Sequence, residues 1–351
     1  MKPANQISLT MFVMVLLAAC SGNSTDRVAD SASSDSAKKE ATLPLQLIAA
    51  QEALYEVIDR EAKAEILGSG YAWTEGPLWI PSEGMLLFSE IPANRVHAWK
   101  QGAEDPEVYL DPAGFTGEGT RGGELGSNGL LLDPEGNLVL CQHGDRRLAR
   151  MTAPIANPAA EYETIVGEFN NQRFNSPNDA AYDAAGNLYF TDPPYGLEHR
   201  MEDPAKEIPY QGVFRYSQAG DLSLLLDSLT RPNGLAFFPG GNQLLIANSD
   251  PDKPYWYRYS VAEDGSLSQG EIYRDASDVG AEEPGLPDGL KIRSDGTVFA
   301  TGPGGVWIFD PEGQELGRID VGQRCSNVAL NETEDVLFVT ADSYVLRIEL
   351  K

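Results

Sequence analysis

Cysteine and histidine are scarce in this sequence of 351 residues, which contains three of each. Apart from Cys20, only Cys141 and Cys325 are present, and no CxxC motif or Cys/His cluster with zinc-ligand spacing occurs. The common structural zinc motifs are therefore excluded. Because Cys141 and Cys325 fall in separate repeats of the chain, we expect no disulfide bond between them.

Basic residues are also few, since 26 lysines and arginines stand against 53 acidic residues and give a net charge of −27. A protein this acidic is a poor partner for nucleic acid or for anionic lipid headgroups. Its charge would raise the local concentration of cations, which gives weak support for a metal site. The sequence makes no prediction about oligomeric state.

Long apolar runs are absent except near the N-terminus, where one extends from Ile7 to Leu17. This run is too short for a membrane span and follows a short charged start, as in a secretory signal peptide. It closes on the motif Leu-Ala-Ala-Cys, which is typical of a bacterial lipoprotein signal. We expect a signal peptide over residues 1–19 and acylation of Cys20; an ordinary signal peptide with an incidental cysteine is the alternative.

The expected location is the bacterial cell envelope, with the lipid anchor in the outer membrane, the protein facing the periplasm and no other membrane contact. Residues 20–45 are rich in Ser, Asp, Ala and Lys and poor in large apolar side chains. Such a composition cannot repay the entropy of ordering, so we predict a flexible tether. One domain over residues 46–351 follows.

A phrase that recurs six times dominates this domain: a polar residue, a short apolar strand, a turn with Gly or Asp, and a second apolar strand. The copies are EGPLWIPSEGMLLFSE from Glu75, NGLLLDPEGNLVLCQ from Asn128, NDAAYDAAGNLYFTD from Asn178, NGLAFFPGGNQLLIAN from Asn233, DGLKIRSDGTVFATG from Asp288 and NVALNETEDVLFVTA from Asn327. A single hairpin cannot bury its own faces, and this period is typical of propellers. The repeats predict an all-β fold, a six-bladed β-propeller.

The blades are expected over residues 75–110, 128–166, 178–226, 233–273, 288–319 and 327–349. The last range holds only about three strands, so residues 55–68 should supply the missing outer strand and close the ring. The linkers that precede the polar positions should meet at one mouth of the channel, where function tends to concentrate. Substrate choice is expected in the loops at 111–127 and 198–211.

The residues that open the repeats all carry oxygen and share one register, just ahead of the strand expected to line the channel. They should therefore converge on one axis, where they would suit a hard divalent cation. Asn and Asp before Gly are also ordinary turn formers, which is the competing interpretation at any one position. The turn interpretation does not fit Glu75, because glutamate is a poor turn residue. Asn327 opens the least typical copy, so we interpret it as a turn residue.

Four stretches carry a resemblance to a known family: EGPLW at Glu75, RFNSPNDAAYDAAGNLYFTDPPYGL at Arg173, RPNGLAF at Arg231 and LPDGL at Leu286. Over about residues 70–345 the chain resembles the family of gluconolactonases, senescence marker protein and luciferin-regenerating enzyme. The runs SPND, FTDPPYGL and CQHGDRRLAR point to its bacterial gluconolactonase branch. The resemblance implies a six-bladed propeller that holds one divalent cation and hydrolyses lactones of sugar acids.

The resemblance also implies roles for individual residues. Glu75, Asn178, Asn233 and Asp288 would be the metal ligands, with Asp288 doubling as the catalytic carboxylate. Calcium is the expected cation, with magnesium, zinc and manganese as alternatives. Asn128, which is not a shared ligand in the family pattern, is left as a substrate contact.

Further candidates come from the residues themselves. His143 could orient substrate or carry a proton, and Arg173 and Arg231 could hold hydroxyl or carboxylate groups of a sugar acid. Each could equally be a structural residue of a blade. Asp179 could bind the same metal or a second one, and Tyr195 is expected to pack within its loop.

In the expected mechanism the metal polarises the lactone carbonyl and Asp288 activates a water molecule, with direct attack by its carboxylate as a variant. Two alternatives remain open. One is a tethered, non-enzymatic propeller that binds calcium for structure and a partner or ligand on its face. The other is a hydrolase of different esters or of phosphotriesters, which the same metal and carboxylate could serve.

Overall fold

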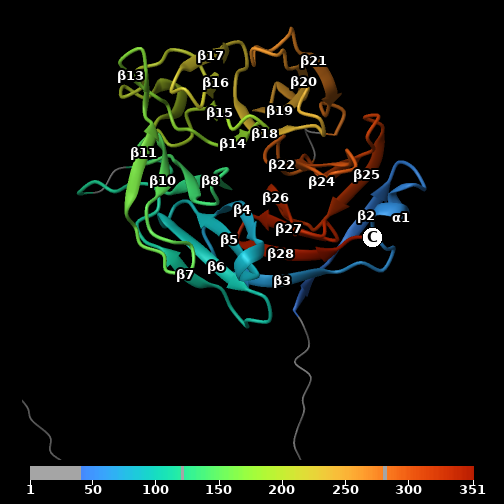
Figure 1. Cartoon of the computed structure of the whole chain (residues 1–351). Helices are drawn as coiled ribbons and strands as arrows, with labels where there is room; N and C mark the ends of the chain where they lie inside the picture. The colour runs from blue at the N-terminus through green and yellow to red at the C-terminus, as the bar shows by residue number, and fades with distance from the viewer. Residues whose placement is uncertain (1–40, 120–121, 280–282) are drawn as a thin grey trace, which may run out of the picture. The chain divides into compact units, whose positions relative to one another are not determined.

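The computed structural model describes residues 41–119, 122–279 and 283–351, which belong to one compact unit. Within these residues six antiparallel sheets surround a central channel, and Figure 1 looks onto this ring. The innermost strands contact one another in the order β4, β8, β14, β18, β22, β26 and back to β4. The predicted six-bladed β-propeller is thereby confirmed.

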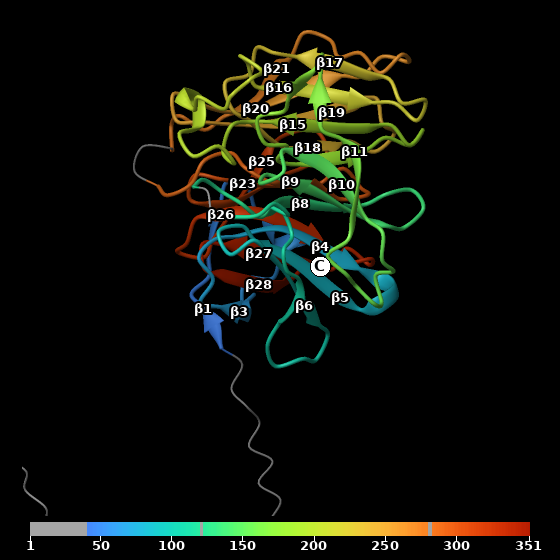
Figure 2. The same ribbon diagram turned by 90° about the vertical axis from the view of Figure 1, so that its left-hand side faces the viewer.

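The first four blades each contain four strands, ordered from the channel outward. Blade 1 holds β4 (Thr74–Ile80), β5 (Met85–Glu90), β6 (Arg95–Lys100) and β7 (Glu107–Leu110), and blade 2 holds β8 (Ser127–Leu132), β9 (Leu138–Gln142), β10 (Arg147–Met151) and β11 (Tyr162–Val166). Blade 3 holds β14 (Ala180–Tyr182), β15 (Leu188–Asp192), β16 (Gly212–Tyr216) and β17 (Leu222–Leu226), and blade 4 holds β18 (Pro232–Phe237), β19 (Gln243–Asp250), β20 (Lys253–Ser260) and β21 (Glu271–Asp275). In the side view of Figure 2, β8, β9 and β10 lie next to one another.

The last two blades each recruit strands from the start of the domain. Blade 5 consists of β22 (Leu290–Ile292), β23 (Val298–Gly302), β24 (Gly305–Phe309), β25 (Glu315–Asp320) and, outermost, β2 (Gln46–Ala49). Blade 6 consists of β26 (Cys325–Leu330), β27 (Val336–Ala341), β28 (Tyr344–Glu349), β3 (Ala64–Ser69) and β1 (Thr42–Leu43). The two ends of the domain therefore share one sheet.

Residues 55–68 were expected to supply the outer strand that closes the ring. The structure shows that only the end of this range belongs to that strand. The outer strand is β3, whereas Leu54–Val57 forms the short helix α1, whose residues Leu54 and Val57 pack into the core between blades 5 and 6. The predicted start of the domain at residue 46 is also late, because β1 already pairs with β3. The fold therefore includes the last residues of the range assigned to the tether.

A few elements lie outside the blades: the short helices η1 (Pro81–Glu83) and η2 (Arg200–Glu202) and the hairpin of β12 (Glu168–Phe169) and β13 (Gln172–Arg173). The predicted signal peptide and Cys20 lie outside the described residues. Among the helices that the structure describes, none is long and apolar enough to cross a membrane. Cys141 and Cys325 are both free thiols and both buried.

Candidate functional site

Five of the six residues that open the repeats meet in one place. Glu75, Asn128, Asn178, Asn233 and Asp288 all line a cavity of about 340 Å³. Each comes from or leads into the innermost strand of a different blade, so the cavity lies where the ring of inner strands surrounds the channel. The predicted convergence is therefore what the structure shows.

The local placement of these residues differs from the prediction in one respect. Glu75, Asn128 and Asn233 lie inside β4, β8 and β18, at interruptions of the ladder with the second strand, and not ahead of these strands. Only Asn178 and Asp288 precede their strands, β14 and β22. A β-bulge bends the strand and re-aims a side chain, which explains how a residue within a strand can face the channel.

Glycine follows the opening residue in four repeats because the inner strands approach one another closely. A Cβ atom on Gly76, whose φ is +51°, would lie 2.1 Å from the carbonyl oxygen of Asn128. A Cβ on Gly234 would lie 2.4 Å from the carbonyl oxygen of Asp288. Gly76 and Gly234 therefore let blades 1 and 4 rest against the backbone of the next site residue.

Hydroxyl groups on the second strands fix the same backbones. Ser89 Oγ donates a hydrogen bond of 2.9 Å to the Asn128 carbonyl, and Thr191 Oγ1 donates one of 2.8 Å to the Asn233 carbonyl. Ser249 Oγ donates to the carbonyl of Pro287, directly before Asp288. Side-chain hydroxyls of one blade thus hold the site residues of the next, and the site is part of the rigid ring.

The cavity concentrates carboxyl groups away from water. Burial raises the pKa of Glu75 to about 8, and the neighbouring carboxylates of Asp179 and Glu124 add to this shift. Burial likewise raises the pKa of Asp288 well above its ordinary range, with Glu75 and Glu124 contributing repulsion. Like charges brought together in this way disfavour ionisation, and a cation among them would favour it.

Several oxygens of the site have no protein partner. Asn128 Oδ1 and Asp288 Oδ1 are buried and accept no hydrogen bond from the described residues. Asn233 donates its Nδ2 to Ser249 Oγ at 3.0 Å, which leaves its carbonyl oxygen for another group. Oxygen ligands of this kind suit calcium or magnesium. Within the described ranges no three His, Cys, Asp or Glu side chains form a metal-binding group, and the candidate set depends on its two amides.

The remaining candidates lie around this centre. Tyr195 lines the cavity, and its hydroxyl donates a hydrogen bond of 3.5 Å to the Ser249 carbonyl in blade 4. Asp179 is buried behind the wall, where its Oδ1 accepts the Ala180 N–H at 2.9 Å. Asn327 does not line the cavity, and its Nδ2 instead donates a hydrogen bond to Glu75 Oε2.

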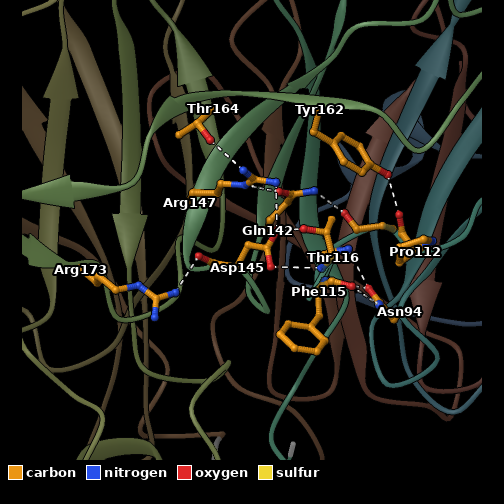
Figure 3. A network of polar contacts seen from close by, with 12 residues as sticks. Asn94, Pro112, Phe115, Thr116, Gln142, Asp145, Arg147, Tyr162, Thr164 and Arg173 are labelled. Atoms are coloured by element: carbon orange, nitrogen blue, oxygen red, sulfur yellow. Dashed lines mark hydrogen bonds and ion pairs between the residues drawn. The ribbon is translucent and has the colours of Figure 1, made fainter. Parts of the chain in front are cut away.

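Three other residues assigned to substrate lie outside the lining. His143 is fully buried and is not part of the lining, but its Nδ1 lies 3.2 Å from Oε2 of the lining residue Glu124. Arg173 is exposed on β13 and donates to the Asp145 carbonyl at 3.0 Å, as Figure 3 shows. Arg231 is likewise absent from the lining. The structure does not bring Arg173 or Arg231 to the cavity.

Sequence reasoning missed several lining residues, namely Trp73, Glu124, Arg200 and Arg324. Glu124 and Arg200 belong to the two loops that were expected to govern substrate choice, but nothing in these loops identified the residues. Arg324 is paired with Asp342 at 2.6 Å, and its guanidinium carbon lies 5.0 Å from the Trp73 ring centroid. The rim thus combines aromatic surface with charge.

Comparison with known proteins agrees with this architecture, a β-propeller with an oxygen-lined site in its channel. Residues 73–343 match the SMP-30/Gluconolactonase/LRE-like region. A gluconolactonase from Zymomonas mobilis is 36% identical over 301 residues, which cover 84% of this chain and 83% of that protein. The chain belongs to the SMP-30/gluconolactonase/LRE-like family.

Solved structures share the fold. A gluconolactonase from Xanthomonas campestris has a TM-score of 0.74 and 26% identity, covering 90% of this chain and 99% of that chain. Regucalcin from Agrobacterium tumefaciens, described as a calcium-binding protein, has a TM-score of 0.61 and 15% identity, covering 81% of this chain and 96% of that chain. At that identity the second likeness concerns the fold alone.

Proposed function

We propose that this protein hydrolyses lactones of sugar acids in the channel cavity, with a divalent cation held by Glu75, Asn178, Asn233 and Asp288. Its family includes proteins named gluconolactonase, and the chain is a lactone-hydrolysing enzyme that acts on carboxylic ester bonds. The finer proposal, which concerns the cation and the role of each residue, rests on one observation. Two carboxylates and three amides from five blades face one small cavity, with buried oxygens that the protein leaves unpaired.

The donor set supports calcium as the cation, because hard oxygen ligands from carboxylates and amides are those that calcium prefers. A relative by fold, regucalcin, is described as calcium-binding, which is consistent with this choice. When bound, a divalent cation supplies Lewis-acid polarisation of a carbonyl oxygen. The protein contributes the oriented ligands that line the cavity.

Asp288 has the position of a general base. Its Oδ1 is buried without a partner, so it is available to a water molecule in the cavity. A general base accepts a proton from the attacking water as the new bond to the carbonyl carbon forms. Cleavage of the ring C–O bond then gives the hydroxy acid, with the proton passed to the leaving oxygen.

Asn128 is the proposed substrate contact within the cavity, since its unpaired Oδ1 can accept a hydrogen bond from a sugar hydroxyl. Trp73 and Tyr195 add apolar surface against which the faces of a sugar ring can pack. Arg173 is omitted from the proposed contacts because it lies on exposed β13 and bonds to Asp145.

The test is hydrolysis of glucono-δ-lactone by the purified protein, followed as acid release in weak buffer. We expect activity that chelator abolishes and added calcium restores. The isosteric variant Asp288→Asn should retain the fold, as measured by circular dichroism. Its rate of hydrolysis should fall by about 10²- to 10⁴-fold, the range typical of the loss of a general base. A folded, calcium-binding protein that opens no lactone would contradict the proposal and favour the non-enzymatic propeller.

A further inference from the structure

Glu124 differs from the other carboxylates of the cavity because a buried histidine lies beside it. Its side chain lines the cavity, is 29% exposed, and lies 3.2 Å from His143 Nδ1 through Oε2. No lysine or arginine of the described chain lies within ion-pair distance of it. Because a carboxylate has two oxygens that accept several hydrogen bonds, Glu124 can accept further bonds from a group in the cavity.

The backbone around Glu124 is also held in place. The N–H of Gly126 donates to the Ile91 carbonyl at 2.9 Å, and the N–H of His143 donates to the Gly126 carbonyl at 3.1 Å. A Cβ on Gly114 would lie 2.0 Å from the carbonyl carbon of Gly126, so the two glycines lie in direct contact. The segment that carries Glu124 is thus joined to blade 1 and blade 2.

The root of the same loop is fixed by a network that Figure 3 shows. Asn94 Oδ1 accepts the N–H groups of Gly114 and Phe115 at 2.7 and 3.0 Å. Asp145 accepts both the N–H and the hydroxyl of Thr116, at 3.1 and 2.6 Å, and is paired with Arg147 at 2.9 Å. A loop with these restraints can present a side chain in a defined position.

Blade 2 therefore supports the loop twice through the motif HGDRR. Asp145 holds the root of the loop through Thr116, and His143 lies against the Glu124 carboxylate near the end of the loop. Gly196 packs directly against His143, since a Cβ on Gly196 would lie 2.8 Å from His143 Cβ. His143 is fully buried, and its Nδ1 lies 3.2 Å from Glu124 Oε2, a contact that becomes an ion pair when the imidazole is protonated.

We propose that Glu124 is the residue that selects polyhydroxylated lactones, and that His143 is its positioning residue. Glu124 accepts hydrogen bonds from adjacent hydroxyls of the substrate. Glu75 and Asp288 do not take this role, because they are the proposed ligands of the cation. The inference rests on the proposed function and names its substrate class as uncharged lactones with neighbouring hydroxyl groups.

The test compares two substrates, glucono-δ-lactone and the unsubstituted δ-valerolactone, with the full-length protein in excess calcium. We expect Glu124→Gln to lower kcat/KM for glucono-δ-lactone by about 10- to 100-fold, the usual worth of hydrogen bonds to a charged group. Activity on δ-valerolactone should change by less than about threefold, because this substrate has no hydroxyl to bind. The exposed residue of the same loop provides a matched control, Glu118→Gln, which should change neither.

The role of His143 is tested by its conservative replacement. His143→Asn keeps a polar side chain beside Glu124 and should retain most of the preference for glucono-δ-lactone, whereas His143→Leu should lose it. Equal losses on both lactones in Glu124→Gln would assign Glu124 to the chemistry or to the cation and overturn the proposal. The proposal would also be overturned if Glu124→Gln left the ratio of kcat/KM for glucono-δ-lactone to kcat/KM for δ-valerolactone unchanged. Failure of the proposed function looks different, since the unaltered protein would then open neither lactone.

Discussion

Asn327 and Glu75, which open the last and the first repeat, are joined by a hydrogen bond of 3.2 Å from Nδ2 to Oε2. The same Oε2 also accepts the N–H of Gly76 at 2.8 Å. Both hydrogen bonds are made to Oε2 of Glu75. Its other carboxylate oxygen, Oε1, is therefore available to a group in the cavity. The pair spans 252 positions of the sequence and crosses the point where the ring closes.

Removal of this support should weaken cation binding without removing a ligand. We expect Asn327→Ala to reduce calcium affinity by about 10- to 100-fold, the usual effect of losing a partner that orients a metal ligand. Titration calorimetry on the chelator-treated protein measures it. The exposed Asn242→Ala is the control and should leave the affinity unchanged. Equal affinities for Asn327→Ala and the original protein would show that Glu75 is held without Asn327.

The close approach at Gly234 should make a single methyl group harmful. Because a Cβ there would lie 2.4 Å from the Asp288 carbonyl oxygen, Gly234→Ala must displace the backbone of Asp288 or its own strand. We expect about 1–3 kcal/mol of lost stability, as for other overpacked sites, and a fall in kcat. Gly167→Ala, whose Cβ would have its nearest contact at 3.5 Å, is the matched control and should be near neutral in urea unfolding. Similar unfolding curves for both variants would refute the argument.

Asp192 makes stability depend on pH. Its two oxygens accept the N–H groups of Asn175 and Ser176, each at 2.8 Å, yet burial raises its pKa to about 7. The unfolded value is about 3.9, so between the two values the folded state binds the extra proton. The free energy of unfolding should therefore fall as pH rises from about 4 to about 7, by up to about 1.4 kcal/mol per pH unit from this group.

Comparison with Asp192→Asn isolates this contribution. Asp192→Asn loses a hydrogen-bond acceptor at every pH, and residue 192 can no longer titrate. The free energy of unfolding of the original protein falls as pH rises from about 4 to about 7, whereas that of the variant lacks this contribution. The difference in stability between the two proteins should therefore shrink over this pH range. Urea unfolding at pH 5, 6, 7 and 8 in excess calcium measures the difference. A deficit that stays constant over this range would exclude a raised pKa for Asp192.

The lipid anchor remains a prediction of the sequence. Cys20 follows small residues at the end of a short apolar run, so the unaltered protein should incorporate labelled palmitate and partition into detergent. Cys20→Ser should incorporate none and should appear as a precursor or in the soluble fraction. Labelling that persists in Cys20→Ser would place the acyl group elsewhere.

The ring and its site were predictable because the sequence repeats. Each copy of the hairpin fixes the register of its first residue, so six positions far apart in the chain could be assigned to one axis, and five of them line the cavity. The glycines that follow four of these residues looked like turn signals. Their actual cause, contact between neighbouring inner strands, needs the three-dimensional structure.

What could not be predicted lies where the repeats give no register. Glu124 and Arg200 belong to linkers without periodicity, and only the fold shows that their side chains line the cavity. His143 was assigned to substrate, but it stands behind Glu124. The strands β1 and β2 have two and four residues, too few for a pattern, and pairing with distant β3 and β25 defines them.

The shared sheet of blade 6 has a consequence for the order in which the molecule can be completed. During synthesis β3 emerges about 280 residues before its partner β28, and β2 also emerges long before β25. Until those partners leave the ribosome, both early segments have unpaired backbone groups, the kind of edge that promotes aggregation. The strands that are synthesised last therefore close the ring, because they give β2 and β3 their partners and complete blades 5 and 6.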